Sequence, residues 1–476
     1  MSHALTSSFV TDQLALRTRR VNTRPARDAG EYVLYWMQST HRFEENWALR
    51  FATREADRRG LPLIVHQGLD PTYEHANDRI HSFILHNARE LAQRAEATGL
   101  RYQFALRRRR ADDRRVVDRM ASRAALVVTD DFPTAGIAER TQRFAARCEC
   151  SVVAVESHAI VPAALFLKEE YAARTLRPKV MAHLEHALRP VVDAPPRVAV
   201  SDTLWNSLEL DRLNLGGDLG ATIATCEIDH AVPPAPMVSG RRAALARLTA
   251  FCRTALADYD ERRSNPADAE GASRLSPYLH FGQVSAAEVA RAAIGAVGRA
   301  RAERFLDELV TWRELALNFS LRNPQHRTLA ALPDWVHRTM QAHEGDAREA
   351  TYTLEQFERA ETHHPLWNAA QNELRATGVI HNVMRMYWGK SVLTWTPDYA
   401  EALRTLIHLN DKWALDGRDP SSYGGIQWCF GKFDRPWGER PVWGTIRSMS
   451  LERAYKKFDA AGYERRWNGG ELALAL

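Results

Sequence analysis

The stretch EYVLYWMQSTHRFEENWALRFATREADRRGLPLIVHQGLD, residues 31–70, decides the fold of the first part of the chain. It opens with an apolar run at 31–38 and closes with another at 61–70, and each has the length of a buried strand. Between them, 41–60 carries apolar residues at helical spacing and stops at Gly60. A strand, a helix and a second strand in this order predict a parallel pair joined by a right-handed crossover.

The same alternation continues along the chain. Residues 81–99 predict a second helix, and the apolar runs 101–106, 124–130 and 151–157 predict three more strands. We therefore expect a Rossmann-like α/β domain with a parallel sheet over residues 30–190, preceded by a flexible N-terminal tail at 1–29. No GxGxxG follows the first strand, so a Rossmann-type dinucleotide site is not supported there.

The pattern changes after residue 190. Prolines and glycines, including VPPAP at 232–236, predict a connector over 191–240. From Arg241 onward the periodicity is helical, and helices are predicted at 241–263, 285–297 and 301–319. The second domain, 241–476, is therefore expected to be all-α.

Composition limits the class of protein. The 476 residues carry a formal net charge of +5, which permits a polyanionic partner but does not require one. No apolar run approaches the roughly 18 residues of a membrane span. The run RRRRADDRRVVDR (107–119) favours a solvated face over a polyanion contact. An odd number of scattered cysteines argues against a disulfide framework and a zinc site and favours a reducing cytoplasm. These cysteines are Cys148, Cys150, Cys226, Cys252 and Cys429.

Tryptophan is unusually frequent in the second half, where ten of the thirteen lie from Trp312 onward. Such aromatics serve as core, stacking platforms or redox relays, and composition leaves these roles open. Trp388 and Trp395 are seven residues apart and share a face if their helix is unbroken. Trp367 precedes Gly378, which predicts a helix break, so Trp367 is expected on the preceding helix. For an isolated pair of this kind, simple aromatic core is the favoured interpretation.

Two further stretches carry chemical signals. In ASRLSPYLHFGQVSAAE (272–288), Ser276 before Pro277 predicts one helix start, and a capping box from Ser285 to Glu288 predicts another. Two such N-termini suit a pyrophosphate, but for this stretch taken alone two ordinary capped helices are the favoured interpretation. In FDRPWGERPVWGTIR (433–447), arginines alternate with tryptophans, as nucleic-acid backbone contact plus stacking requires. A structural loop rich in cation–π contacts is the alternative.

These stretches belong to an ordered series that covers nearly the whole chain. The series includes YVLYWMQ, ENWAL, KEEYAARTLRPK (168–179), RLSPYLHFGQVS, LDELVTWREL, WNAAQ, MRMYWGK, LNDKWALDGRDP, FDRPWGERPVWGTIR and KKFD (456–459). In this order they resemble the class II cyclobutane pyrimidine dimer (CPD) DNA photolyases of the photolyase/cryptochrome family. The resemblance implies an antenna domain, a helical FAD-binding domain and a carbon–carbon lyase. It implies light-dependent repair of damaged DNA by electron transfer from excited reduced FAD to a flipped-out pyrimidine dimer.

The resemblance also implies roles for individual residues near FAD. Asn410 is expected to face N5 of the flavin, and Arg385 and Asp416 to flank its ring as an ion pair. The other positions expected to contact FAD are Tyr259, Ser273, Leu275, Ser276, Gln283 and Asp419.

On the substrate side, Glu308 is expected to hydrogen-bond the dimer, which requires a partly protonated carboxyl group. Met386 is expected to pack against the dimer, and Trp312 and Trp428 to wall it. The matches expected to contact DNA are Arg435, Trp437, Arg440 and Arg447, with Trp437 and Arg447 filling the gap that the dimer leaves.

For photoreduction of the flavin, the resemblance makes Trp388 the proximal and Trp367 the distal donor, with Trp395 and Tyr352 as accessory members. The chain departs from the family pattern at His363-His364, at His381-Asn382 and in a segment before Trp437 that is one residue shorter. The family can carry a second antenna chromophore, often a deazaflavin, but no local motif here identifies one. We expect a monomer. The alternative functions are a cryptochrome-like photoreceptor without repair and a nucleotide-binding α/β protein with an unrelated helical domain.

Overall fold

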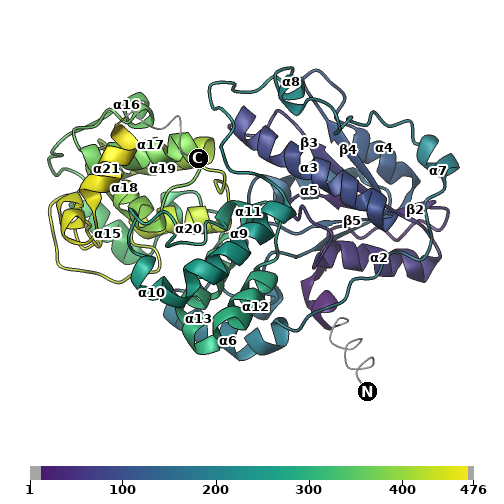
Figure 1. The fold of residues 1–476 in the computed structure, drawn as a ribbon, viewed down its shortest axis with the longest axis horizontal. Helices are drawn as coiled ribbons and strands as arrows, with labels where there is room; N and C mark the ends of the chain where they lie inside the picture. The colour runs from purple at the N-terminus through teal and green to yellow at the C-terminus, as the bar shows by residue number, and fades with distance from the viewer. Residues whose placement is uncertain (1–11, 470–476) are drawn as a thin grey trace.

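The computed structural model describes residues 12–469. A sheet covered by helices forms one part of the molecule, and a bundle of helices forms the other (Figure 1). The strands are β1 (Thr18–Arg20), β2 (Tyr32–Met37), β3 (Leu63–Leu69), β4 (Arg101–Leu106), β5 (Ala124–Asp130) and β6 (Ser151–Val155), in the spatial order β1-β6-β5-β2-β3-β4. The five strands predicted from apolar runs are therefore confirmed.

Helices cover both faces of this sheet. They are α2 (Trp47–Arg59), α3 (Asp78–Thr98), α4 (Val116–Arg123) and α5 (Ile137–Arg147). Asn46 and Asn77 cap the N-termini of α2 and α3 through their side chains, and Gly60 ends α2 in the left-handed conformation. Because both faces are covered, β2 is buried along its whole length, as a parallel strand of this kind requires.

The sheet and the N-terminal tail differ from expectation at one edge. β1 pairs antiparallel with β6, so the sheet is mixed, and this part of the predicted flexible tail 1–29 is ordered. The Arg17 guanidinium is buried beside it, 2.6 Å from Glu156. Pairing with β1 satisfies backbone groups that would otherwise be open along the edge of β6. The earlier part of the tail, 1–11, lies outside the described residues.

The connector contains short helices rather than a plain linker. After η1 (Ala163–Leu165) and α6 (Ala173–Ala187) come α7 (Asp202–Asn206) and α8 (Leu219–Ile223). Leu176, Val180 and Leu184 of α6 share one buried apolar cluster with Phe305 of the helical part. The helix α6 thus packs against the bundle, although the sequence assigned it to the α/β domain.

The second part is helical, as predicted. Its elements are α9 (Arg241–Thr254), η2 (Leu256–Asp258), α10 (Tyr259–Arg262), α11 (Ser276–His280), α12 (Ala286–Val297), α13 (Arg299–Leu306), η3 (Asp307–Trp312), α14 (Arg313–Arg322), η4 (Leu329–Ala331), α15 (Asp334–Ala342), α16 (Leu354–Arg359), α17 (Pro365–Thr377), α18 (Asn382–Thr394), α19 (Tyr399–Trp413), α20 (Pro420–Cys429), η5 (Leu451–Lys456) and α21 (Ala460–Asn468). The helix predicted at 241–263 breaks at Ala255. None of the helices between residues 12 and 469 is long and apolar enough to cross a membrane.

The two helix starts predicted around 276 and 285 form differently from the prediction. Leu275 is the N-cap of α11, so Ser276 lies inside the first turn and its hydroxyl does not cap the helix. Ser285 caps α12 by accepting from the N–H groups of Ala287 and Glu288. The Glu288 carboxylate does not complete a capping box, because it pairs with Arg241 at 2.7 Å. A charged partner holds a carboxylate more strongly than a backbone N–H does.

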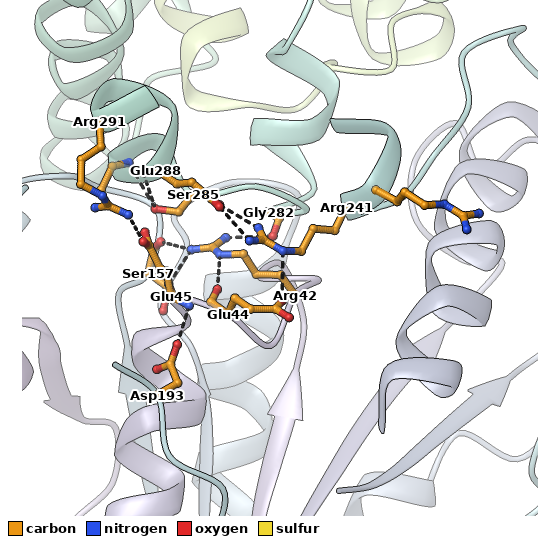
Figure 2. Close-up of polar contacts among 12 residues, drawn as sticks. Arg42, Glu44, Glu45, Ser157, Asp193, Arg241, Gly282, Ser285, Glu288 and Arg291 are labelled. Carbon is orange, nitrogen blue, oxygen red and sulfur yellow. Dashed lines mark hydrogen bonds and ion pairs between the residues drawn. The ribbon is translucent and has the colours of Figure 1, made fainter. Parts of the chain in front are cut away.

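A buried arginine joins the two parts of the molecule (Figure 2). The Arg42 guanidinium, 1% exposed, donates to the carbonyl oxygens of Glu44, Glu45 and Ser157 and, across the junction, to that of Gly282 at 2.8 Å. Burial lowers its pKa to about 10. Around it, Arg241 pairs with Glu44 and Glu288, and Arg291 pairs with Glu45. These contacts fix the orientation of the sheet relative to the helices.

Replacing this arginine should destabilise the protein. In Arg42→Met, four carbonyl oxygens lose their donor, and we expect the free energy of unfolding to fall by about 3 kcal/mol. The measurement is the midpoint of urea unfolding at unchanged slope. Arg253, an exposed arginine of α9, supplies the control, because Arg253→Met should change stability by less than about 0.5 kcal/mol. Equal midpoints for Arg42→Met and the unaltered protein would contradict this role for Arg42.

Candidate active site

A cavity of about 610 Å³ lies in the helical part, and residues of α10, α11, η3, α18 and α20 line it. Its volume is within the range of small-molecule and cofactor sites. Many of the residues singled out from the sequence line it, although they come from distant segments. Those residues are Tyr259, Ser273, Leu275, Ser276, Glu308, Trp312, Arg385, Met386, Asp416, Asp419, Trp428 and Arg447.

One wall is a π-helical turn, η3, set between α13 and α14 in a continuous helix. Single π turns inside helices are frequent at functional sites. Both Glu308 and Trp312 belong to this turn and line the cavity. The sequence predicted an ordinary helix across 301–319, because a π turn leaves the apolar periodicity of a short segment almost unchanged.

Glu308 is partly buried and faces two arginines. Its Oε1 lies 2.5 Å from Nη2 of Arg263 and 3.5 Å from Nη2 of Arg304. Burial raises the pKa of Glu308 although both arginines oppose the shift. The sequence analysis missed Arg263. The available signal was its position four residues after Tyr259, one helical turn, which places both on one face.

Another part of the lining carries the expected ion pair. Nη2 of Arg385, on α18, lies 2.9 Å from Oδ1 of Asp416. Nη1 of Arg385 also donates to Oδ1 of Asn410 and Oγ of Ser422, each at 3.3 Å. The Asn410 amide donates to Asp411 at 2.9 Å, so both ends of the amide are held. Asn410 is buried directly behind this wall and does not itself line the cavity.

A second buried pair also belongs to the lining of the cavity. Asp419 caps α20 and places Oδ2 3.1 Å from Nδ1 of His280. Burial alone would raise the pKa of Asp419, but the hydrogen bond and charge of His280 hold it well below its usual range. His280 lines the cavity and was missed by the sequence analysis, since a lone histidine between Leu279 and Phe281 carries no distinguishing pattern.

The loop before α11 forms a further part of the lining. Ser273, Arg274 and Ser276 line the cavity, and Arg274 adopts a positive φ of 53°, a strained backbone for a side chain of this size. Gln283 does not reach the cavity, because its amide is fully buried and bonded to Ser239 and Gly240. The N-terminus of α12 does not reach it either, so only one of the two predicted helix starts contributes.

At the mouth of the cavity, Trp428 contacts the C-terminal loop. The Arg447 guanidinium lies 5.7 Å from the Trp428 ring and 4.8 Å from the ring of Trp437. Trp437 is 38% exposed, and the Arg435 guanidinium also lies over its ring, at 4.7 Å. Of this loop only Arg447 and Phe433 line the cavity, so Arg435, Trp437 and Arg440 lie outside it.

A lysine that the sequence analysis did not single out supports this mouth. Lys390 is fully buried and donates to the carbonyl oxygen of Cys429 at 2.7 Å. Its Nζ lies 4.9 Å from the ring of Trp428 and 5.5 Å from that of Trp443. Burial lowers its pKa to about 8. This cation therefore holds one wall of the cavity and the adjoining loop together.

The four aromatic residues expected to form a relay are in contact in one row. The rings of Trp388 and Trp367 are stacked with centroids 6.3 Å apart and planes at 9°, and Trp367 is 6.1 Å from Trp395. Trp395 is 5.9 Å from Tyr352. Trp367 lies on α17, which ends at Gly378 as predicted, and Trp395 follows α18 rather than lying within it.

The lining suits an extended, partly anionic cofactor. Ser273 and Ser276 line the cavity together with apolar side chains and seven arginines. These arginines are Arg177, Arg263, Arg274, Arg304, Arg313, Arg385 and Arg447. Buried Nε of Arg263 and Nε2 of His381 have no hydrogen-bond partner among the described residues, although both residues line the cavity. Such orphaned donors are expected where a ligand completes the hydrogen bonding.

A mixed sheet joined to a helical bundle is also the fold of solved photolyase and cryptochrome structures. A cryptochrome from Synechocystis superposes with a TM-score of 0.71 at 16% identity over 92% of this chain and 88% of that chain. A Sulfolobus tokodaii photolyase with two FAD molecules gives 0.68 at 20% identity over 91% and 89%. These likenesses confirm the predicted fold class.

Sequence comparison is more specific. The DNA photolyase family model matches residues 33–198. The deoxyribodipyrimidine photo-lyase of Methanothermobacter thermautotrophicus is 34% identical over 96% of this chain and 98% of its own length. That of Oryza sativa is 37% identical over 91% of this chain and 87% of its own. The chain belongs to the photolyase/cryptochrome family.

Proposed function

We propose that the protein is a class II photolyase that uses FAD and light to split cyclobutane pyrimidine dimers in DNA. The observation that carries this proposal is the cavity itself, which is lined both by Glu308 and Trp312 of the π turn and by Arg385 and Met386 of α18. Relatives named deoxyribodipyrimidine photo-lyase, 33–37% identical over at least 90% of this chain, support the reaction. The ordered motifs of the sequence support the class.

The deeper walls are proposed to hold FAD. Ser273 and Ser276 would bind its phosphates, with Tyr259 and Leu275 contacting the rest of the molecule. Arg385, paired with Asp416, would lie beside the flavin ring and stabilise negative charge on it, and the held amide of Asn410 would lie behind that pair. Asp419 would fix the α20 terminus that borders this region. Bound FAD supplies the light absorption and one-electron chemistry, which protein side chains alone do not provide.

The outer part of the cavity is proposed to receive the dimer after it is flipped from the duplex. Extrusion costs a few kcal/mol and least at damaged bases, which helps to select the lesion. Trp312 and Trp428 would wall the dimer with flat apolar rings, and Met386 would pack against it. Glu308 would present its carboxyl group to a carbonyl oxygen of the dimer. Its raised pKa favours the protonated, donating form.

The exposed Trp437 is proposed to support the duplex that surrounds the flipped dimer. Trp437→Ala should weaken binding of a lesion-containing duplex about tenfold, since stacking of one base is worth about 1–3 kcal/mol. Binding of the same lesion in single-stranded DNA should change little, because no gap needs filling. The measurement is equilibrium binding of both DNAs at one fixed salt concentration.

Trp205 on α7 is the matched control for that prediction. Like Trp437, it lies between two arginines, with Arg212 at 4.2 Å and Arg101 at 5.6 Å. It belongs to the connector packed on the sheet, away from the cavity. Trp205→Ala should leave both affinities unchanged, and an equal loss of single-stranded binding in Trp437→Ala would contradict the proposed role.

The experiment that tests the function combines a spectrum with a repair assay. The purified protein should show flavin absorption, and a deazaflavin-type second chromophore would add a separate band. Illumination with the reduced cofactor should restore a thymine-dimer oligonucleotide. Flavin without light-dependent repair would favour the cryptochrome-like photoreceptor, and absence of flavin would exclude both. Sedimentation of the same sample tests the expected monomer.

A further inference from the structure

Tyr352 ends the row of aromatic rings and forms a short hydrogen bond with a histidine. Its phenol oxygen lies 2.6 Å from Nδ1 of His363, and the backbone N–H of His363 donates to the same oxygen at 2.9 Å. The Tyr352 N–H donates to the carbonyl oxygen of Trp395 at 3.0 Å, which fixes Tyr352 against the last tryptophan. The phenol group is therefore held by both neighbours at the surface end of the row.

The chemistry of a phenol gives this contact a consequence. Tyrosine has an ordinary pKa near 10 and is neutral at physiological pH. An oxidised tyrosine must release its proton, so a tyrosine donates an electron readily only where a base can accept that proton. A base is suitably placed at about 2.6–3.2 Å, and neutral imidazole is the side chain best suited to this role near pH 7. Nδ1 of His363 meets this distance requirement.

We propose that His363 is the proton acceptor that makes Tyr352 the terminal electron donor of the row. This inference rests on the proposed function, because it requires that bound FAD would act as the light-driven oxidant of Trp388. The electron hole left on Trp388 then passes through Trp367 to Trp395. One electron then leaves Tyr352 and restores neutral Trp395, while the O–H bond breaks and its proton forms a bond to Nδ1 of His363. The products are a neutral tyrosyl radical and an imidazolium.

The position of His363 allows it to act again. The residue is exposed, so the imidazolium can release a proton to water. The His363 ring also lies 4.9 Å from that of Trp395, the residue that carries the electron hole before Tyr352 is oxidised. Loss of the proton from Tyr352 prevents simple return of the electron from the flavin side, because recombination then requires the proton as well. The pair would thus prolong the charge separation.

His364 is the natural comparison within the chain. It is adjacent in sequence and its ring is stacked toward Trp395 at 6.4 Å, but its Nδ1 faces the N–H of Leu366 as the cap of α17. It therefore has the same side chain, near the same tryptophan, without contact with the phenol oxygen. Asparagine at this position would preserve the cap.

The test is flash absorption spectroscopy on the flavin-loaded protein in H2O and D2O. In the unaltered protein, the tryptophan radical should give way to a tyrosyl radical, and this step should slow in D2O. In His363→Asn, which keeps a hydrogen-bond acceptor but no base, the step should slow about a hundredfold. In Tyr352→Phe the tyrosyl signal should be lost, and His364→Asn should behave as the unaltered protein does. Added imidazole should restore the rate in His363→Ala.

The outcomes separate this inference from the function on which it rests. Absence of any tryptophan radical in the unaltered protein would overturn the relay itself. A tryptophan radical with tyrosyl formation at the same rate in His363→Asn, or with no isotope effect, would overturn the role of His363 alone. A readout independent of the flavin is the nitrogen-15 NMR signal of the His363 imidazole, which should shift in Tyr352→Phe because that substitution removes the hydrogen bond to Nδ1.

Discussion

Illumination should no longer reduce oxidised flavin in Trp388→Phe. Trp388 is stacked on Trp367, and it is the member of the row that is proposed to donate directly to the flavin. Phenylalanine keeps an aromatic ring, although a smaller one without the Nε1–H that donates to Gln371 at 3.0 Å. It is far harder to oxidise than tryptophan, so the row loses its first electron donor. We expect a near-complete loss of photoreduction, measured as the decay of the oxidised flavin band under blue light with an external reductant present. Repair by chemically reduced protein should remain, because the dimer takes its electron without the row.

The control for that prediction is Trp413→Phe. Trp413 is also buried in the helical part, in a contact with the Arg79 guanidinium at 5.5 Å, and its Nε1 has no partner among the described residues. The substitution therefore removes a tryptophan of the same domain without breaking a hydrogen bond. It should leave photoreduction intact. Normal photoreduction in Trp388→Phe would show that the row is aromatic core and not a relay.

Glu308→Ala should lower the yield of repair per absorbed photon about tenfold. A single donor placed where negative charge develops contributes about 10² to 10³ in rate, and repair must outrun return of the electron to its source. Glu308→Gln keeps a donor at the same position and should retain most of the yield. The measurement is restored thymine dimers per photon with the cofactor fully reduced, so that differences in photoreduction do not contribute.

The pH profile of the yield checks the protonation state. Because the pKa of Glu308 is raised, its donating form increases as pH falls from about 8 toward the raised value, and the yield should increase in that direction. In Glu308→Gln this dependence should disappear. A yield in Glu308→Ala equal to that of the unaltered protein would exclude the proposed contact with the dimer. Glu308→Ala also removes the ion-pair partner of Arg263. The effect of that loss on binding is measured separately, as the affinity for lesion-containing DNA in the dark.

Much of the fold could be predicted from local pattern alone. The apolar runs that form β2 to β6 and the helix stops at Gly60 and Gly99 depend on residues a few positions apart. The antiparallel strand β1 could not be predicted, because three residues with one apolar neighbour give no periodic signal and their pairing depends on the open edge of β6. The break at Ala255 and the π turn at Asp307–Trp312 are likewise set by packing.

The candidate site divides in the same way. Motif order assigned Arg385 and Asp416 to one site, and their side chains do meet at 2.9 Å. Gln283 belonged to the same motif set but is used to bond Ser239 and Gly240 at the domain junction. An amide at this position could contact FAD or bond the backbone and side chains of the junction. Only the placement of the surrounding chain decides between these two roles.

The sequence by itself determined the α/β and helical halves, the aromatic residues of the second half and the family to which their order belongs. Periodicity and motif spacing are properties of neighbouring residues, so they survive without a structure. Only the tertiary structure decided that Glu308 faces Arg263, that Ser276 leaves its hydroxyl uncommitted as a cap, and that Trp395 meets Tyr352 and His363. Those contacts join segments far apart in the chain, and their geometry follows from how the helices pack.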